Sequence, residues 1–243
     1  MTASVHPTFA PRLLTAREEV PGVRVFRFAS PPGFTFILGQ FLMFHFADDP
    51  KTWRAYSLCS APGCASDHFE VAVGMVGAFS ERLGRLTPGA EDGLHVRGPF
   101  GKWTYDGSVE HAVLVSGGTG LTPFRAMVLL KAGGGRAGRL TVCCSARTPE
   151  LLLFRSEYAD WQKAGANVVA RITRPDESTR RWKGPVGRWT APDVAAIAAD
   201  PAAVYYLCGP NKMVVDLREG LQAAGTPLEN IRTEKWGDYS DLF

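Results

Sequence analysis

Residues 113–127, VLVSGGTGLTPFRAM, contain the amino-acid types that bind a phosphate group. An apolar strand-like run precedes Gly117, Gly118 and Gly120, and a helical pattern begins near Pro123. Glycines in such a turn let backbone amides approach an anion without interference from Cβ atoms, and the helix N-terminus points N–H groups at it. The loop therefore favours a dinucleotide site, and a plain flexible turn is the alternative.

A second glycine turn, Cys208-Gly209-Pro210, lies between another predicted strand and a helical pattern. Ligands of open α/β sheets bind outside the carboxyl ends of the strands, so residues 117–122 and 208–210 are expected to line one crevice. We reject the formal GxGxxG match at 133–138, because it follows a helix and precedes a strand, where no helix N-terminus faces an anion.

Residues 54–57, Arg-Ala-Tyr-Ser, place a charge, a phenol and a hydroxyl within four positions of a predicted strand. In a strand, Arg54 and Tyr56 share one face while Ala55 and Ser57 share the other. All four can serve one site only if the strand twists locally or ends there. An edge strand with surface Arg and Tyr is the alternative interpretation.

Two patterns of predicted elements position these groups. Residues 1–106 hold short segments rich in Val, Phe and Tyr, separated by Pro and Gly, which predict an antiparallel β-barrel with one short helix at 79–86. Residues 107–243 alternate apolar strands with segments of helical period, which predict a doubly wound parallel α/β sheet. We therefore expect two domains, 1–106 and 107–243.

Two helix starts are specific enough to predict. Thr148 followed by Pro149 and Glu150 predicts a helix over 149–165, since a hydroxyl cap, proline and an acid favour a first turn. Ser80 is expected to cap the short helix that follows it.

The bulk composition is that of a globular protein. The chain has 243 residues, 45% of them hydrophobic and 21% charged, and its net charge is only +3. This charge gives no strong case for binding nucleic acid or a membrane surface. No apolar run reaches the roughly 18 residues of a membrane helix, no secretory signal is visible, and the five cysteines have no disulfide spacing. We expect a soluble, cytoplasmic protein.

Short motifs in one order along the chain resemble the ferredoxin–NADP reductase superfamily. The motifs are Gly39-Gln40-Phe41, Arg54-Ala55-Tyr56-Ser57, Gly77-Ala78-Phe79-Ser80, Gly98-Pro99-Phe100-Gly101, the loop 117–123, and Cys208-Gly209-Pro210 with Met213. Each motif alone is a weak signal, but the ordered set covers the whole chain. The resemblance implies a flavin-binding β-barrel followed by an NAD(P)-binding domain.

The resemblance also implies how the flavin is held, and it favours FAD over the FMN of a branch with a fused iron–sulfur domain. Arg54 is expected to pair with the pyrophosphate, for which a guanidinium offers a planar fork of donors. Tyr56 is expected to pack along the ring and ribityl chain, and Ser57 to lie near the reactive N5. Ala55 belongs to the same motif, and the helix start at Gly77-Ala78-Phe79-Ser80 is expected to donate amides to the phosphates.

By the same resemblance, the second half binds NAD(P)H and presents nicotinamide C4 to flavin N5. The expected contact residues are Gly117, Gly118, Thr119, Gly120, Thr122, Pro123, Cys208, Gly209, Pro210 and Met213. Small residues such as Thr119 leave room for the two rings to approach within about 3–3.5 Å. The catalytic candidates are Ser57, Cys208 and Glu234, and we expect Cys208 to position the nicotinamide rather than attack it.

The chain end matches the superfamily in part. Members commonly finish with an acidic residue and, two positions later, an aromatic that covers the flavin, as Glu234 and Trp236 do here. Because seven further residues follow Trp236, Tyr239 and Phe243 are alternatives for the stacking residue.

Thr173-Arg174 stands where NADP-specific relatives carry a Ser-Arg pair for the 2′-phosphate. Arg180 and Arg181 follow closely, and Arg155 lies on the preceding predicted helix. This favours NADPH over NADH, although solvated surface charge is the alternative.

The cysteines and histidines do not predict a metal site. Cys59 and Cys64 have the first spacing of a plant-type iron–sulfur run, but Asp67 occupies the third ligand position. The electron acceptor is therefore expected to be a separate molecule: ferredoxin, flavodoxin or an oxygenase component. The alternatives are an NADH-dependent reductase component of a multicomponent oxygenase and a non-catalytic electron-transfer subunit.

Overall fold

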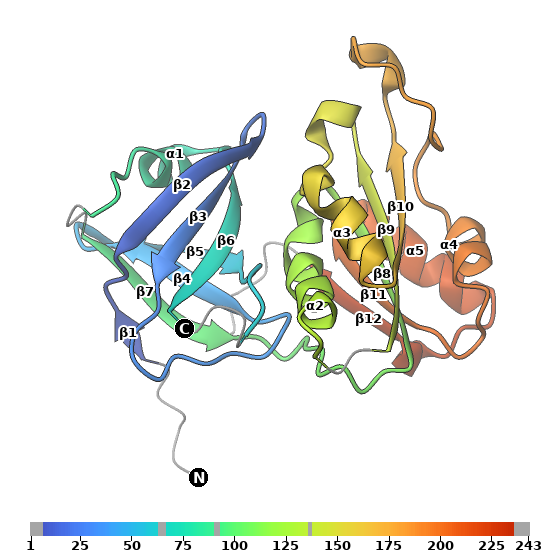
Figure 1. Ribbon diagram of the computed structural model, residues 1–243, viewed down its shortest axis with the longest axis horizontal. Coiled ribbons are helices and arrows are strands. Elements are labelled where there is room, and N and C mark those ends of the chain that lie inside the picture. The colour runs from blue at the N-terminus through green and yellow to red at the C-terminus, as the bar shows by residue number, and fades with distance from the viewer. Residues whose placement is uncertain (1–6, 63–66, 90–92, 136–137, 236–243) are drawn as a thin grey trace.

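The computed structural model describes residues 7–62, 67–89, 93–135 and 138–235, which form a mainly β half beside an α/β half (Figure 1). The segment between the two halves runs from about residue 101 to residue 110. The domain boundary predicted at 106/107 lies in this segment and stays a prediction. No helix in the described part of the chain is long and apolar enough to cross a membrane.

The first half contains two antiparallel sheets. Its elements are β1 (Thr8–Phe9), β2 (Leu13–Val20), β3 (Val23–Ala29), β4 (Phe41–Phe46), β5 (Asp49–Ser57), β6 (His68–Gly74), α1 (Ala78–Gly84) and β7 (Leu94–Phe100). One sheet has the order β1-β7-β4-β5 and the other β2-β3-β6. A bridge between Leu58 and Val71 joins the sheets just beyond the end of β5.

Aromatic side chains fill the space between these sheets. Phe28 lies at the centre, with its ring centroid 5.4 Å from that of Phe69 and 5.9 Å from that of Phe44. All three are fully buried, and each removes a large apolar surface from water. This rigid core holds the strands that carry residues 54–57.

The second half is a five-stranded parallel sheet with the order β10-β9-β8-β11-β12. Its strands are β8 (His111–Gly117), β9 (Arg139–Ala146), β10 (Ala166–Ile172), β11 (Val204–Gly209) and β12 (Ile231–Lys235). Its α-helices are α2 (Thr122–Ala132), α3 (Tyr158–Lys163), α4 (Ala191–Ala198) and α5 (Asn211–Ala223). The predicted fold class, an antiparallel barrel half followed by a doubly wound parallel sheet, is confirmed.

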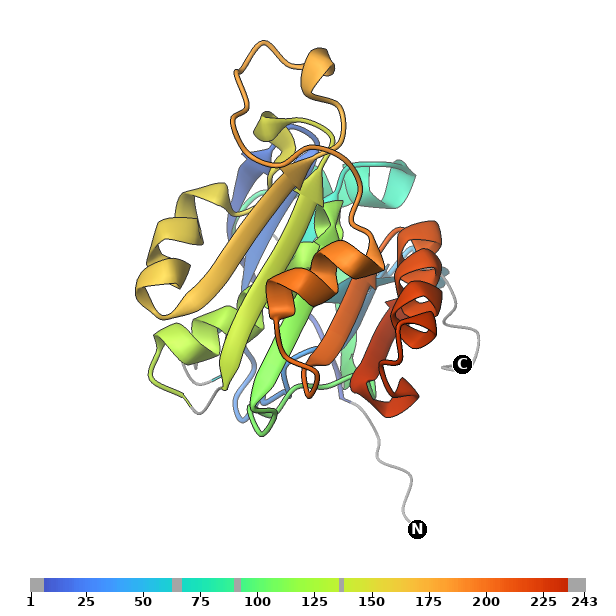
Figure 2. The ribbon, with the colours of Figure 1, turned by 90° about the vertical axis from the view of Figure 1, so that its right-hand side faces the viewer.

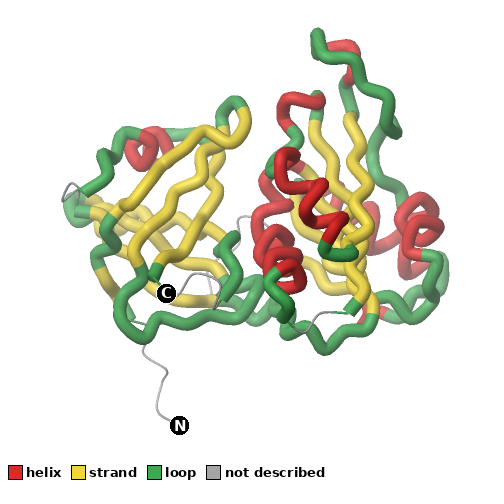
Figure 3. Tube along the Cα trace, in the orientation of Figure 1, coloured by secondary structure: helices red, strands yellow, loops and turns green. Residues whose placement is uncertain are grey.

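Apolar side chains of β8 point alternately to the two faces of this sheet, and helices cover both faces. Ala112 and Leu114 belong to the core that contains α2 and α3, whereas Val113 and Val115 belong to the core under α4 and α5. Figure 2 shows α4 and α5 in front of the sheet, and Figure 3 shows the helices concentrated in this half. The α2 side faces the β half, so the two halves share a buried core there.

The structure differs from the sequence prediction at three places. Strand β2 was not predicted, because Arg17, Glu18 and Glu19 interrupt its apolar residues. The predicted helix over 149–165 is instead two 3₁₀ turns, Pro149–Leu151 and Arg155–Glu157, followed by the short α3.

The break occurs at Phe154, which adopts a left-handed conformation with φ 54°. Its N–H donates to Glu19 Oε1 of β2 at 3.0 Å, so a tertiary contact replaces the helical hydrogen bond. The third correction concerns Ser80, which lies in the first turn of α1, whereas Gly77 occupies the N-cap.

Candidate functional site

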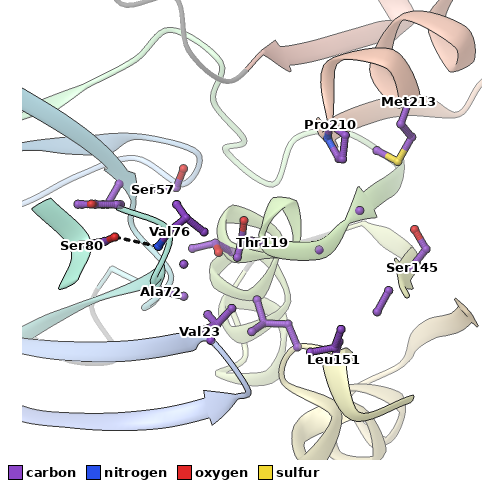
Figure 4. Close-up of a pocket in the computed structure, with 18 of the residues that line it drawn as sticks. Val23, Ser57, Ala72, Val76, Ser80, Thr119, Ser145, Leu151, Pro210 and Met213 are labelled. Atoms are coloured by element: carbon purple, nitrogen blue, oxygen red, sulfur yellow. Dashed lines mark hydrogen bonds between the residues drawn. The ribbon is translucent and has the colours of Figure 1, made fainter. Parts of the chain in front are cut away.

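A cavity of about 2200 Å³ lies between the two halves (Figure 4). Its walls include β5 and the start of α1 on one side, and the turn after β8 with the start of α5 on the other. Small-molecule pockets commonly measure about 300–1,000 Å³, so this cavity has room for more than one extended ligand.

The segment 54–57 forms one wall, and all four of its residues line the cavity. All four side chains are exposed or half-buried, so residues on each face of β5 reach the lining. Residues with alternating directions can therefore serve one site. Burial raises the pKa of Tyr56 to about 12, so its phenol stays protonated and can donate a hydrogen bond.

The start of α1 lies next to this wall, and Gly77, Ala78, Phe79 and Ser80 all line the cavity. The Ser80 hydroxyl accepts hydrogen bonds from the N–H groups of Val76 and Gly77 at 3.0 and 3.1 Å. Ser80 therefore fixes the tight entry into the helix from within its first turn.

On the opposite wall, Gly117, Gly118, Thr119 and Thr122 line the cavity. The chain leaves β8 at Gly117 and passes through a 3₁₀ turn, Gly118–Leu121, into α2. Gly118 has φ +56°, a left-handed conformation that glycine adopts without strain. Figure 4 shows Thr119 projecting into the cavity toward Val76.

The remaining glycines of the loop and of the turn after β11 have a packing role. A Cβ at Gly120 would collide with the backbone carbonyl of Cys208, and one at Gly209 would lie 3.0 Å from Gly117 N. Gly120, Pro123, Cys208 and Gly209 thus lie behind the wall, whereas Pro210 and Met213 line it. The glycines let the turn after β8 and the end of β11 approach closely.

Two buried polar atoms belong to residues of the cavity lining, and they bear on whether a polar ligand fits there. Thr122 Oγ1 and Trp189 Nε1 have no hydrogen-bond partner among the described residues, and both residues line the cavity. An unpaired buried hydroxyl or indole N–H costs about 1–3 kcal/mol. A ligand with polar groups at these points removes that cost, so the lining fits a bound nucleotide.

Cys208 and Glu234 face each other on neighbouring strands behind this wall. They are register partners on β11 and β12, and Cys208 Sγ lies 3.9 Å from Glu234 Oε2. Burial raises the pKa of Glu234 to about 7, opposed by the hydrogen bond from Cys208. The proposed stacking residues Trp236, Tyr239 and Phe243 lie outside the described residues.

Thr173 and Arg174 line the cavity just after β10, the edge strand of the parallel sheet. Arg174 Nη1 donates to Glu177 Oε1 at 2.9 Å, and both side chains are about half exposed. Arg155 and Arg180 instead line a separate small pocket.

Arg147 and Arg188 also line the cavity, and neither was predicted from the sequence. Arg147 directly follows β9, and a search of positions just after each parallel strand could have found it. Arg188 lies in a loop and gave no such signal.

Basic side chains outnumber acidic ones in the lining. The basic residues are Arg54, Arg82, Arg147, Arg174, Arg188 and Lys212, and the acidic ones are Asp49 and Asp216. Lys212 and Asp216 pair with each other at 2.9 Å. The excess positive charge suits ligands with several phosphates.

Comparison with known proteins assigns each half to a family. Residues 12–105 match the oxidoreductase FAD-binding domain, and residues 114–219 match the oxidoreductase NAD-binding domain. Ferredoxin–NADP reductase B of Sorangium cellulosum (strain So ce56) is 32% identical over 241 residues, which cover 94% of this chain and 97% of that protein.

Solved structures share the fold. The ferredoxin reductase in carbazole 1,9a-dioxygenase gives a TM-score of 0.80 at 22% identity, over 95% of this chain and 70% of that one. A ferredoxin NADP⁺ reductase from Neisseria gonorrhoeae, with bound FAD and NADP, gives 0.75 at 20% identity, over 93% of this chain and 98% of that one.

Proposed function

Because this chain belongs to the ferredoxin–NADP reductase superfamily, we propose that it oxidises NADPH and passes the electrons through FAD to a separate one-electron carrier. The resemblance inferred from the ordered motifs is confirmed, and the chain is an FAD-dependent oxidoreductase. The single observation that carries the proposal is the cavity, which is lined both by residues 54–57 and by the turn after β8.

The β wall is proposed to hold FAD. Arg54 offers a guanidinium to the pyrophosphate, and Tyr56 offers an apolar ring with a protonated phenol to the flavin and its ribityl chain. The turn at Gly77–Ser80, which lines the same wall, is proposed to face the phosphates. When bound, FAD supplies the conversion of a two-electron oxidation into single-electron steps.

The α/β wall is proposed to hold the nicotinamide nucleotide. Thr122 has the unpaired buried hydroxyl that a carboxamide or ribose group can satisfy. Thr119, which Figure 4 shows facing the β wall, limits how far the nicotinamide can slide toward Ser57. Orientation of this kind accounts for a large share of the rate when two reactants must meet in one geometry.

At the carboxyl ends of β11 and β12, Glu234 is proposed to hold or release a proton, and Cys208 is proposed to donate a hydrogen bond to it. The pKa of Glu234 lies near neutrality, so this carboxyl can hold or release a proton at the working pH. Cys208 donates to it and packs behind the loop, with no need to act as a nucleophile.

NADPH is proposed as the preferred donor. Arg147, Arg174 and Arg188 line the cavity, and we propose that they face the adenosine ribose, where a 2′-phosphate would add two negative charges. Within the described part of the chain, Arg174 is the one of the three that pairs with a carboxylate, that of Glu177, and this pair is exposed enough to open for a phosphate.

The acceptor is proposed to be ferredoxin or flavodoxin, with an oxygenase component as the second candidate. The first follows from the name of the Sorangium relative. The second is favoured by the structural likeness to the reductase in carbazole 1,9a-dioxygenase and by 26% identity to the reductase subunit of a stachydrine N-demethylase of Rhizobium meliloti.

A steady-state assay tests the proposal. The flavin is released and identified, and oxidation of NADPH and of NADH is measured with ferricyanide, then with purified ferredoxin, flavodoxin and an oxygenase ferredoxin. We expect FAD, higher kcat/KM with NADPH, and transfer to ferredoxin or flavodoxin. A preference for NADH with transfer only to the oxygenase ferredoxin supports the second candidate, and no oxidation of either nucleotide contradicts both.

A further inference from the structure

A cluster of charged side chains joins the two halves beside the cavity. We call it the seam cluster, and it consists of Arg125 on α2, Glu157, Glu70 on β6 and Arg27 on β3. Arg125 and Glu70 are buried at its centre, Glu157 is partly exposed, and Arg27 lies at the exposed edge. Its two positive and two negative charges balance, as buried ions require.

Arg125 is the central member of the seam cluster. Its Nε donates to both carboxylate oxygens of Glu157, at 3.0 and 2.8 Å. Its Nη1 donates to Glu70 Oε2 at 2.7 Å and to the backbone carbonyl of Cys59 at 3.0 Å. The guanidinium also lies 4.8 Å from the ring centroid of Phe154.

These bonds divide into two groups. The bonds to Glu157 stay within the α/β half, whereas those to Glu70 and Cys59 cross to the β half. Only a guanidinium presents donors in several fixed directions from one planar group. A lysine ammonium is a single point charge and cannot hold the same three partners with the same geometry.

The partners are close in sequence to residues that line the cavity. Cys59 comes two residues after Ser57, and Glu70 comes two residues before Ala72. Arg125 itself comes three residues after Thr122, one turn along the same helix. One guanidinium therefore ties together the backbone segments that carry opposite walls of the cavity.

We propose that Arg125 is a positioning residue that sets the separation and angle between the β wall and the nicotinamide loop. The inference rests on the proposed function, because it concerns the alignment of the same two ligands. Arg125 touches neither ligand and acts by holding α2 against β6 and the segment after β5. A misplacement of about 1 Å at the reacting atoms can cost about 100-fold in rate.

The first test compares Arg125→Met and Arg125→Lys with Arg27→Gln as the matched control. Arg27 also pairs with Glu70, at 2.8 Å, but this bond stays within the β half. We expect the limiting rate of FAD reduction at saturating NADPH to fall about 100-fold in Arg125→Met and less in Arg125→Lys. FAD content and the Kd for NADP⁺ should stay near wild type, and Arg27→Gln should reduce at the wild-type rate.

A wild-type limiting rate in both Arg125 variants overturns the proposal. So does a loss of rate that only follows a loss of FAD. If Arg125→Met does not fold, Arg125→Lys, which keeps the charge, decides. Failure of both to fold while Arg27→Gln folds makes Arg125 a residue of folding stability and also overturns the proposal.

The second test does not depend on activity. Spin labels are attached at Arg85→Cys and Lys163→Cys, whose native side chains are 79% and 77% exposed and lie in opposite halves. Cys64 is replaced by serine in all samples, and the four cysteines among the described residues are buried. We expect the distance between the two labels to have a narrow distribution in the protein with Arg125 and a broadened or shifted one in Arg125→Lys. Identical distributions in the two proteins contradict the proposal. If wild type is not reduced by NADPH or NADH, the proposed function fails while this measurement still decides on Arg125.

Discussion

Replacing Glu234 by glutamine should remove most of the loss of folding stability that burial of this carboxyl causes in the wild type as pH rises from 4.5 to about 7. Glu234 lies on β12 opposite Cys208, and burial raises the pKa of its carboxyl from 4.5 to about 7. The hydrogen bond from Cys208 offsets only part of this burial effect. Glutamine has nearly the same shape and does not ionise, so Glu234→Gln isolates the contribution of the charge.

The pKa shift fixes the sign and size of the effect. A folded-state pKa above the unfolded value means that the folded protein binds the proton more tightly. The wild type therefore loses stability as pH rises from 4.5 to about 7. The full loss, for a pKa raised from 4.5 to about 7, corresponds to about 3 kcal/mol.

The assay is urea unfolding of the wild type and Glu234→Gln, each with saturating FAD, from about pH 4.5 to about pH 8.5. The free energy of unfolding of Glu234→Gln minus that of wild type should increase by about 3 kcal/mol across this range. Glu229→Gln is the matched control, because Glu229 is exposed five residues earlier, and its difference from wild type should stay flat. A flat difference for Glu234→Gln as well would refute the desolvation of Glu234.

Three further substitutions test the walls of the cavity. Arg54→Gln should weaken FAD binding about 10- to 100-fold in a fluorescence titration, because it removes one charge-assisted hydrogen bond. Lys51→Gln is the control and should leave FAD binding unchanged, since Lys51 lies on the same strand but outside the lining. Gly120→Ala should lower the free energy of unfolding by about 1–3 kcal/mol, because its Cβ meets the backbone of β11; equal stability would contradict the packing role. Arg174→Gln should lower the NADPH-to-NADH ratio of kcat/KM about 10- to 100-fold. Arg180→Gln is the control and should leave this ratio unchanged. An unchanged ratio in Arg174→Gln would exclude Arg174 as a 2′-phosphate contact.

Local chemistry made much of the site predictable from the sequence. The turn at 117–120 needs glycine for backbone conformation or close approach, and Pro123 marks the start of α2, so the strand, the loop and the helix could be ordered correctly. Residues 54–57 could be assigned to a strand, although their shared access to one cavity depends on the position of β5 beside the α/β half.

Long-range contacts explain what could not be predicted. The apolar run 151–154 matches a helical period, but the bond from Phe154 N–H to Glu19 breaks the helix with a partner 135 residues away. The seam cluster is similar, since Arg125 binds Glu70 and Cys59 across 55 and 66 residues. Ion pairs of this kind leave no periodic signal in a single sequence.

Anaerobic stopped-flow mixing of the purified flavoprotein with NADPH or NADH tests the central claim most directly, because it isolates the step that requires both walls of the cavity. We expect the visible absorption of the bound flavin to be bleached in a single turnover, and faster with NADPH than with NADH. A bound flavin that stays oxidised at saturating concentrations of both nucleotides would contradict the proposed function.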